Sequence, residues 1–397
     1  MRIVMIGPFA WTPKGTVRAR AFHIARGLVR RGHQVTILLV PYDNPEEAGR
    51  KFELDGVRVH ELTITRPKGF SFFCDSFRLA HTALRLRPDV VHIFKPIGYS
   101  GLAGMWLAVF SQRPLVVDTD DWEGTGGWND VNPYPWVWKR FFDFQERWLP
   151  RHAGAVTVAS QTLQTQVWGF GVPPERVIYL PNGPDVFLRQ SKPAGDQPRA
   201  KIRARLGVGD AALAIYVGHI PRGNDLDLAI EALPRVVAEA GDVRLLIIGE
   251  GDGRPALEEQ VHRLGLDERV IFTGWVDRAE VPAYLAAADV AIYPYRDTLI
   301  NRAKCAGKVI EYMAMGKAVV TGRVGMNLEY IVHGESGLLT KPGDVDDFAA
   351  AMVRVLVDRN LAAQLGRNAE ARIWAEFDWD ARVGEIERAY AIAGGQG

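Results

Sequence analysis

Short apolar runs alternate with stretches of helical periodicity along the whole chain. The runs have the length and the Val, Ile and Leu content of buried strands, and the stretches between them are long enough for crossover helices. This alternation predicts parallel sheets with helices packed on them. The predicted strands cover residues 3–6, 35–40, 57–62, 90–94, 115–117, 155–159 and 177–180 in the first half, and 213–217, 244–248, 270–272, 290–293 and 318–320 in the second.

The predicted strands form two sets, separated by residues 190–199, which are rich in turn formers and polar residues. A chain of 397 residues is also long for a single core. We therefore predict an α/β fold with two doubly wound, Rossmann-like parallel-sheet domains, residues 1–190 and 200–375, facing a central cleft. In such sheets ligands bind beyond the carboxyl ends of the strands, so the loops there are where we expect chemistry.

Composition narrows the class of protein. Lys and Arg (48) nearly balance Asp and Glu (47), which argues against nucleic acid as a partner. Basic side chains are in excess in the first half and acidic ones in the second. Either the first domain faces an anionic acceptor or membrane surface, or these charges are scattered over a solvated surface. Two cysteines, Cys74 and Cys305, cannot build a disulfide framework or a four-ligand metal site, so a reducing compartment fits.

The N-terminus runs directly into the first predicted strand, without a long apolar stretch or a cleavage-site pattern. The longest apolar candidate, residues 97–110, is broken by glycines and falls short of the roughly 20 residues needed to cross a bilayer. We therefore expect a cytoplasmic protein whose only membrane contact would be peripheral, at the inner face and through the first domain.

Two loops that follow predicted strands carry candidate anion-binding groups. Gly15 precedes a helical pattern, where backbone N–H groups can approach an anion, although a plain turn glycine fits equally well. Gly218, His219 and Arg222 follow the first strand of the second half. Arg222 can donate charge-assisted hydrogen bonds to a diphosphate, and a solvated loop arginine is the alternative.

Residues 301–320 form the sharpest segment. Gly307 opens a predicted helix, Lys308 and Glu311 are expected in its first turn, and Gly316 ends it. The start of this helix, with Lys308, could hold a phosphate. Glu311 could accept both hydroxyls of a ribose or could cap the helix, and the spacing does not decide between these two roles.

In their order along the chain, these segments resemble the family-4 retaining glycosyltransferases of the GT-B fold. The resemblance covers nearly the whole chain, and its motifs are weak singly but very specific in this order. They are Arg31-Gly32-His33, Asn182-Gly183-Pro184-Asp185, Gly218 with Arg222-Gly223, Ile248-Gly249-Glu250-Gly251, Phe272-Thr273-Gly274-Trp275-Val276, Ala288-Asp289-Val290 with Pro294, residues 308–316, residues 334–339 with Pro342-Gly343-Asp344, and Phe377-Asp378-Trp379.

The resemblance implies an enzyme that moves a sugar from a nucleoside-diphosphate sugar to a hydroxyl of a carbohydrate, glycolipid or small-molecule acceptor. It implies retention at the anomeric carbon, no metal or other required cofactor, and a last helix, about residues 376–397, that crosses back to the first domain. The roles it implies are ribose binding for Glu311, diphosphate binding for Arg222 with Lys308 or Lys304, a place against the distal phosphate for Gly15, and base contacts near Trp275 and Val276.

The chain departs from the family pattern at two positions. Ala303 stands where the family usually has a glutamate that touches the transferred sugar, and Asn301, Arg302 or backbone groups of 303–307 could take over that contact. Asp120 stands roughly where many relatives have a histidine near the reacting carbon. It could orient the acceptor hydroxyl or stabilise positive charge on the sugar. The spacing of Asp118 and Asp120 also matches a metal-binding pattern of the other major glycosyltransferase fold, which the two strand sets argue against.

Two aromatic segments leave a choice open. Residues 122–148 contain Trp122, Trp128, Trp136, Trp138 and Trp148, which could pack a helix, stack on sugar rings or lie at a membrane interface. Residues 66–87, basic and with Phe70, Phe72, Phe73 and Phe77, read as a core helix with solvated arginines or as a membrane-grazing face.

Two rival functions also stay open. A GT-B sugar-nucleotide epimerase would bind the same donor but convert it without an acceptor. A non-catalytic sugar- or nucleotide-binding protein is suggested by the missing glutamate at Ala303.

Overall fold

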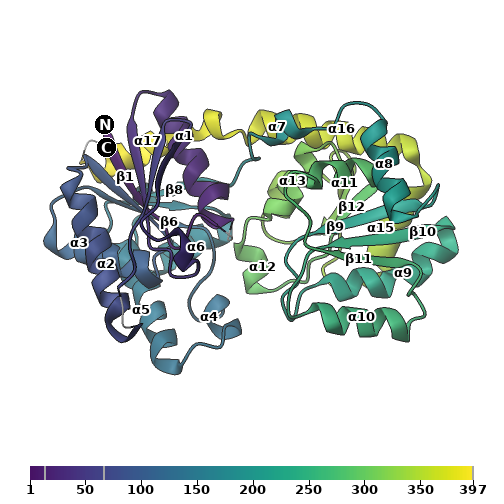
Figure 1. Cartoon of the computed structure of the whole chain (residues 1–397), viewed down its shortest axis with the longest axis horizontal. Coiled ribbons are helices and arrows are strands. Elements are labelled where there is room, and N and C mark those ends of the chain that lie inside the picture. Colours follow the sequence, from purple (N-terminus) through teal and green to yellow (C-terminus); the bar gives the residue numbers. More distant parts are fainter. Residues whose placement is uncertain (13–14, 66–67, 396–397) are drawn as a thin grey trace. The chain divides into compact units, whose positions relative to one another are not determined.

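The computed structural model describes residues 1–12, 15–65 and 68–395, and for residues 68–70 the backbone alone. These residues form two compact units, each built around one sheet (Figure 1). The first unit contains Met1–Asn182, Arg302–Cys305 and the chain from Trp379 onward, and the second contains Gly183–Asn301 and Ala306–Asp378.

Within the described residues, the sheet of the first unit has eight strands in the order β3-β4-β2-β1-β5-β6-β7-β8. All neighbours are parallel except the edge pair β3–β4. The edge strand β3 was not predicted, because its alternating pattern is polar and its side chains are mostly exposed. The strands are β1 (Arg2–Ile6), β2 (Gln34–Leu39), β3 (Lys51–Leu54), β4 (Val57–Glu61), β5 (Val90–Phe94), β6 (Leu115–Thr119), β7 (Ala155–Val158) and β8 (Val177–Tyr179).

Helices cover both faces of this sheet, because successive side chains of a strand point to opposite sides. In β1, Ile3 and Met5 pack in the cluster that holds α1 and α17, whereas Val4 and Ile6 pack in the cluster that holds α2, α3 and α5. The helices of this unit are η1 (Val17–Ala21), α1 (Phe22–Arg30), η2 (Pro45–Glu47), α2 (Lys68–Arg85), α3 (Gly98–Phe110), α4 (Trp128–Val131), α5 (Trp136–His152), α6 (Gln161–Gly169), η3 (Pro174–Arg176) and α17 (Trp379–Ala393).

The second sheet is wholly parallel, and the described residues give it six strands in the order β11-β10-β9-β12-β13-β14. The short strand β14 was not predicted, since only three residues follow Gly337 before the next polar turn. The strands are β9 (Ala212–Val217), β10 (Val243–Ile248), β11 (Val270–Gly274), β12 (Val290–Tyr293), β13 (Val319–Gly322) and β14 (Leu338–Thr340). Every predicted strand of both sheets is found within two residues of its predicted ends.

The remaining helices belong to the second unit, except that α12 ends in the segment Arg302–Cys305 of the first. They are α7 (Leu188–Ser191), α8 (Gln197–Leu206), α9 (Leu226–Ala240), α10 (Arg254–Arg263), α11 (Val281–Ala287), α12 (Leu299–Ala303), α13 (Gly307–Ala314), α14 (Asn327–Tyr330), α15 (Val345–Val357) and α16 (Arg359–Glu376). Among the residues that the structure describes, no helix is both long and apolar enough to cross a membrane.

Residues 190–199, interpreted from the sequence as a linker, lie within the second unit. The chain passes into that unit at Gly183, and residues 197–199 already belong to α8. Arg199 and Arg203 of α8 donate hydrogen bonds to backbone carbonyls at the end of α11. These tertiary contacts order a segment whose own apolar pattern is too weak to predict a helix.

Candidate active site

At the carboxyl edge of the second sheet, the loops that follow β9, β10 and β11 are held together by backbone hydrogen bonds. The N–H of Gly218 donates to Ile248 and the N–H of Gly249 donates to Gly274, both at 2.9 Å. The ring of His219 donates through Nδ1 to the carbonyl of Glu250 at 2.8 Å. The predicted residues Gly218 and His219 are thus parts of a rigid backbone surface beyond the strand ends.

Gly249 is needed for this close approach. Its φ of +140° is unusual for other residues, and a Cβ there would lie 1.8 Å from the carbonyl oxygen of Gly218. The loop after β10 therefore needs glycine at this position in order to pack against the loop after β9, independently of any ligand.

Arg222, Trp275 and Val276 border the same edge. Arg222 lies in an exposed turn with Gly223, and within the described residues no hydrogen bond or ion pair is recorded for its side chain. Trp275, just beyond β11, is 68% exposed, and Val276 is half-buried. This arginine and this indole are both exposed, so a ligand at the sheet edge can reach them.

Helix α13 is fixed to this edge by Tyr312. The buried Tyr312 hydroxyl accepts the N–H of Val217 at 2.7 Å and donates to the carbonyl of the same residue at 3.2 Å. Because Val217 ends β9, this pair of bonds ties the second half of α13 to the end of that strand. The helix stops before Gly316, which has a φ of +70°, as predicted.

Glu311 does not lie in the first turn of α13, so that prediction was wrong. The helix begins at Gly307, which puts Glu311 one turn further along, and its carboxylate is bound instead by Lys308, with Nζ 2.7 Å from Oε2. Both side chains are partly exposed. The capping interpretation therefore loses its basis, and a neutralised, accessible carboxylate remains.

The positions around the missing family glutamate are already engaged. The amide of Asn301 donates to Asp225 at 2.8 Å and to the carbonyl of Arg296 at 2.9 Å, which leaves it no free donor. The side chain of Ala303 is fully buried in an apolar cluster of the first unit. Lys304 and Arg302 belong to the same four-residue segment of that unit. The side chain of Asn301 can therefore offer a sugar its amide oxygen but no N–H, and Ala303 can offer its backbone.

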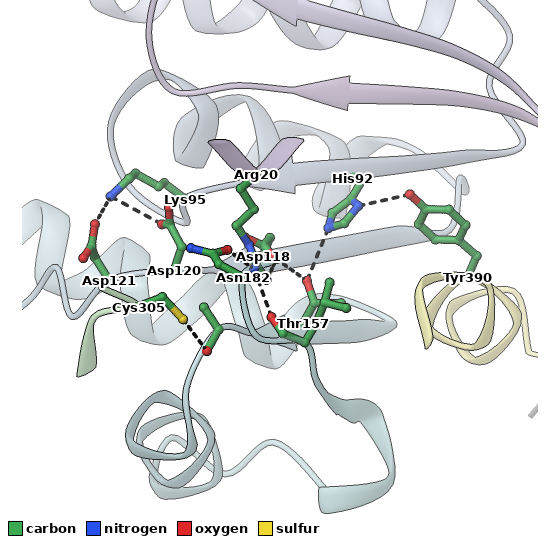
Figure 2. A network of polar contacts seen from close by, with 12 residues as sticks. Arg20, His92, Lys95, Asp118, Asp120, Asp121, Thr157, Asn182, Cys305 and Tyr390 are labelled. Carbon is green, nitrogen blue, oxygen red and sulfur yellow. Dashed lines mark hydrogen bonds and ion pairs between the residues drawn. The ribbon is translucent and has the colours of Figure 1, made fainter. Parts of the chain in front are cut away.

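In the first unit, a buried network lies at the carboxyl ends of β6 and β7 (Figure 2). Arg20 of η1 binds both carboxylate oxygens of Asp118 at 2.7 Å, and it also donates to the carbonyl of Leu180 and to Asn182. Thr157 donates to the same carboxylate at 2.5 Å. Burial works against the charge of Arg20, but Asp118 outweighs it and raises the pKa of the guanidinium.

This geometry rules out the metal-binding interpretation of Asp118 with Asp120. Both oxygens of Asp118 are taken by Arg20 and Thr157, in a place that solvent does not reach. The role of Arg20 was not predicted, because Arg18 stands two residues away in the same segment and the sequence does not tell which of the two is buried.

Asp120 belongs to a second cluster, centred on the ammonium of Lys95 (Figure 2). Lys95 Nζ lies 3.4 Å from Asp120 Oδ1 and 2.8 Å from Asp121 Oδ2, and it also binds Glu123. Lys95 has a φ of +63°, which is strained for a residue with a side chain. The oxygens of the three acids are close enough together to hold a cation, and the Lys95 ammonium lies among them.

The environment of Asp120 moves the pKa of its carboxyl group close to neutral pH. Burial raises the pKa of Asp120 to about 7, Lys95 opposes that rise, and Asp121 adds to it. Near neutral pH Asp120 therefore exists in both protonation states, and it can either accept a hydrogen bond from a sugar hydroxyl or donate one.

Gly15 lies in an exposed bend ahead of η1, and its carbonyl accepts the N–H of Ala19 at 2.7 Å. A Cβ at this position would meet no atom within 4 Å. The fold of the first unit therefore does not itself require glycine here.

Comparisons with known proteins show the family of this chain. The family described as "Glycosyl transferase 4-like domain" matches residues 15–183, and "Glycosyl transferases group 1" matches residues 211–358. The GDP-mannose-dependent alpha-(1-6)-phosphatidylinositol monomannoside mannosyltransferase of Mycolicibacterium smegmatis is 30% identical over 391 residues, covering 90% of this chain and 98% of that protein. An uncharacterized glycosyltransferase of Methanocaldococcus jannaschii is 26% identical, covering 99% and 98%.

Among solved structures, the HepE protein of Anabaena in complex with UDP superposes with a TM-score of 0.73 at 20% identity, covering 98% of each chain. The sucrose-phosphate synthase of Thermosynechococcus elongatus gives the same TM-score at 21% identity, with the same coverage. These likenesses show the GT-B fold. With two parallel-sheet units, two family matches and a relative similar over nearly its whole length, this chain belongs to the family-4 glycosyltransferases of the GT-B fold, enzymes that transfer a sugar from a nucleotide sugar.

Proposed function

We propose that this enzyme transfers a hexosyl unit from a nucleoside-diphosphate sugar to an acceptor hydroxyl with retention at the anomeric carbon. The observation that carries the proposal is the edge of the second sheet, where the exposed Arg222 follows β9 and where α13, which carries the Lys308–Glu311 pair, is tied to the end of β9 by Tyr312. This edge offers both cations for a diphosphate and a carboxylate for a ribose.

Glu311 binds the ribose hydroxyls, and Arg222 with Lys308 or Lys304 holds the diphosphate. Each charge-assisted hydrogen bond from such a side chain contributes about 1.5–3 kcal/mol. Lys308 reaches a phosphate by leaving Glu311, which then has both oxygens free for the ribose. Trp275 and Val276 contact the base, Gly218 and His219 form the adjoining backbone surface, and Gly15 lies against the distal phosphate.

Retention follows if the new bond forms on the face from which the leaving group departs. The bond between the anomeric carbon and the phosphate oxygen breaks, the acceptor oxygen bonds to that carbon, and the acceptor proton moves to the departing phosphate. Cations at the diphosphate stabilise the charge that develops there, so this route uses no metal ion and no strong protein base. Asp120 orients the acceptor hydroxyl or stabilises the positive charge on the sugar.

Product analysis tests the reaction. Incubation with GDP-mannose, UDP-glucose, ADP-glucose and dTDP-glucose and a panel of sugar and glycolipid acceptors should release one nucleoside diphosphate and form a glycoside. The NMR coupling at the anomeric proton should show the configuration of the donor. An inverted product would contradict retention, an epimerised donor without acceptor would favour the epimerase, and binding without turnover would favour the binding protein.

The first unit also carries a surface suited to a membrane, and we propose that it brings the enzyme to lipid-linked acceptors. Large apolar side chains are exposed on α2, α3 and α5, which pack side by side (Figure 1), and α5 also carries the exposed Arg140 and Arg147. Phe70, also considered from the sequence, lies outside the residues whose side chains are described. The exposed residues are Phe73, Phe77, Trp106, Val109, Phe110, Trp136, Val137 and Phe144. Aromatic and basic side chains together favour an anionic lipid surface.

Vesicle binding tests this surface. Trp136 is 71% exposed, so a Trp136→Ser, Phe110→Ser variant should keep its stability and lose most of its sedimentation with vesicles containing anionic lipid. Val357→Ser, at a position of the second unit that is 62% exposed, is the control. Equal sedimentation of all three proteins would exclude this face as the membrane contact.

A further inference from the structure

The loop that follows β1 is held by carboxylates along three successive residues. The N–H of Ala10 donates to Asp43 at 2.9 Å, that of Trp11 to Glu61 at 2.9 Å, and that of Thr12 to Glu47 at 3.0 Å. Three adjacent backbone donors that all meet side-chain carboxylates fix the course of a loop with no regular secondary structure of its own.

The three acids come from different parts of the sheet edge. Asp43 follows β2, Glu47 lies in η2, and Glu61 ends β4. Thr12 adds a hydroxyl bond to Glu47 at 2.6 Å, and Trp11 packs in the apolar cluster of α1. The loop is therefore fastened on both its polar and its apolar side.

The charge balance of this arrangement is unfavourable unless a proton is present. Glu61 is 1% exposed and Glu47 is nearly as buried, while Arg50 is the cation that binds Glu47, at 3.2 Å. Burial raises the pKa of Glu61 to about 7, and Glu47 adds to that rise, whereas the Trp11 N–H and Arg50 oppose it. Burial also acts on Glu47, but its bonds from Thr12, together with Glu61 and Arg50, lower its pKa.

One proton on Glu61 therefore removes the repulsion between the carboxyl groups of Glu61 and Glu47. A protonated Glu61 still accepts the N–H of Trp11 through one oxygen, and its hydroxyl can face the ionised Glu47. Loss of that proton leaves two carboxylates side by side in a buried place, with Arg50 as the cation that the described residues bring to Glu47, which weakens the attachment of Trp11 and Thr12.

We propose that Glu61, together with Glu47, is a positioning residue for sugar transfer, which fixes residues 10–12 ahead of Gly15, the residue proposed to lie against the distal phosphate, and that it does so while it carries a proton. The inference rests on the proposed function, because that function assigns the distal phosphate to Gly15, three residues after Thr12. The inference gives Glu47 and Glu61 a role in sugar transfer although neither touches the substrate.

A pH profile of kcat/KM for the nucleotide sugar tests this inference. The wild type should lose activity above pH about 7 through a rise in KM, because Glu61 ionises there. Glu61→Gln keeps an acceptor for Trp11 and a donor for Glu47 but cannot ionise, so it should match the wild type at pH 6 and keep a flat KM to pH 9. Glu61→Ala should raise KM about tenfold at pH 6, the equivalent of one lost hydrogen bond.

The matched control is Glu385→Gln, which removes another carboxyl of the first unit whose pKa is raised by burial but which lies outside the loop contacts. Its KM profile should follow that of the wild type. Asp120 is present in every variant, so its own titration does not distinguish one variant from another. A Glu61→Gln profile that superimposes on the wild type would overturn the inference even if Glu61→Ala fails to fold.

A stability measurement separates positioning from mere folding. Because the folded-state pKa of Glu61 lies above its ordinary 4.5, its stabilisation is present below pH 4.5 and is lost as the pH rises to about 7. Glu61→Gln should remove that dependence from the thermal midpoint as well as from KM. A changed midpoint with an unchanged KM profile would assign Glu61 to folding alone. If no nucleoside diphosphate stabilises the wild type, the proposed function itself fails, and this inference with it.

Discussion

Arg20→Met should lower the free energy of unfolding by about 3–5 kcal/mol, because it leaves the buried carboxylate of Asp118 without its cation. Asp118 is completely buried, and beyond Arg20 its recorded side-chain bond comes from Thr157. The guanidinium also ties η1 to Leu180 and Asn182, so its loss should loosen the sheet edge that carries Asp120. Denaturant unfolding followed by circular dichroism measures the effect.

Arg30→Met is the control, because Arg30 pairs with Asp380 in the same unit but both side chains are about half exposed. It should cost at most about 1 kcal/mol. Adding Asp118→Asn to Arg20→Met should recover part of the loss, since no buried charge then remains. Equal destabilisation by Arg20→Met and Arg30→Met would refute the structural role assigned to the buried pair.

Glu311→Ala should weaken binding of the matching nucleoside diphosphate by about 2–3 kcal/mol, roughly 30- to 150-fold in Kd, if both ribose hydroxyl bonds are lost. The same change releases Lys308, whose freed charge would attract the diphosphate. That second effect has the opposite sign, so weaker binding must come from the ribose. Calorimetric titration with UDP, GDP, ADP and dTDP measures both the loss and the base preference.

Glu335→Ala, an exposed glutamate of the same unit, is the control and should leave Kd unchanged. Lys308→Met divides the site further. It should weaken binding of the diphosphate more than that of the monophosphate, whereas Glu311→Ala should weaken both alike. Unchanged nucleotide affinity in Glu311→Ala would exclude Glu311 as the ribose ligand.

The strand pattern could be predicted because parallel strands that are buried on both faces consist almost entirely of apolar residues. Strands such as β1 and β9 are covered on both faces, so each reads as a continuous apolar run. The edge strand β3 escaped prediction for the same reason, since its exposed residues need not be apolar. Helix α8 escaped because its place is set by Arg199 and Arg203 reaching the end of α11, which no local pattern records.

The sequence allowed us to predict which segments form the candidate site, but not which of their side chains contact one another. The loops with Gly218, Arg222 and Glu311 could be found by their place after strands and by the order of the family motifs. The pairing of Glu311 with Lys308 depends on where α13 begins, and the sequence put that glutamate one turn too early. Lys95 and Glu61 carried no signal, because a single charged residue beside a strand is common at protein surfaces.

The sequence by itself determined the two α/β sets, the family and the segments proposed to bind the donor, because apolar periodicity and ordered motifs are properties of the chain. Tertiary structure alone decided which charges are buried together. Arg20 meets Asp118 and Trp11 meets Glu61 across 98 and 50 residues of chain. Burial and proximity set protonation and charge balance, and both exist only once distant segments have been brought together.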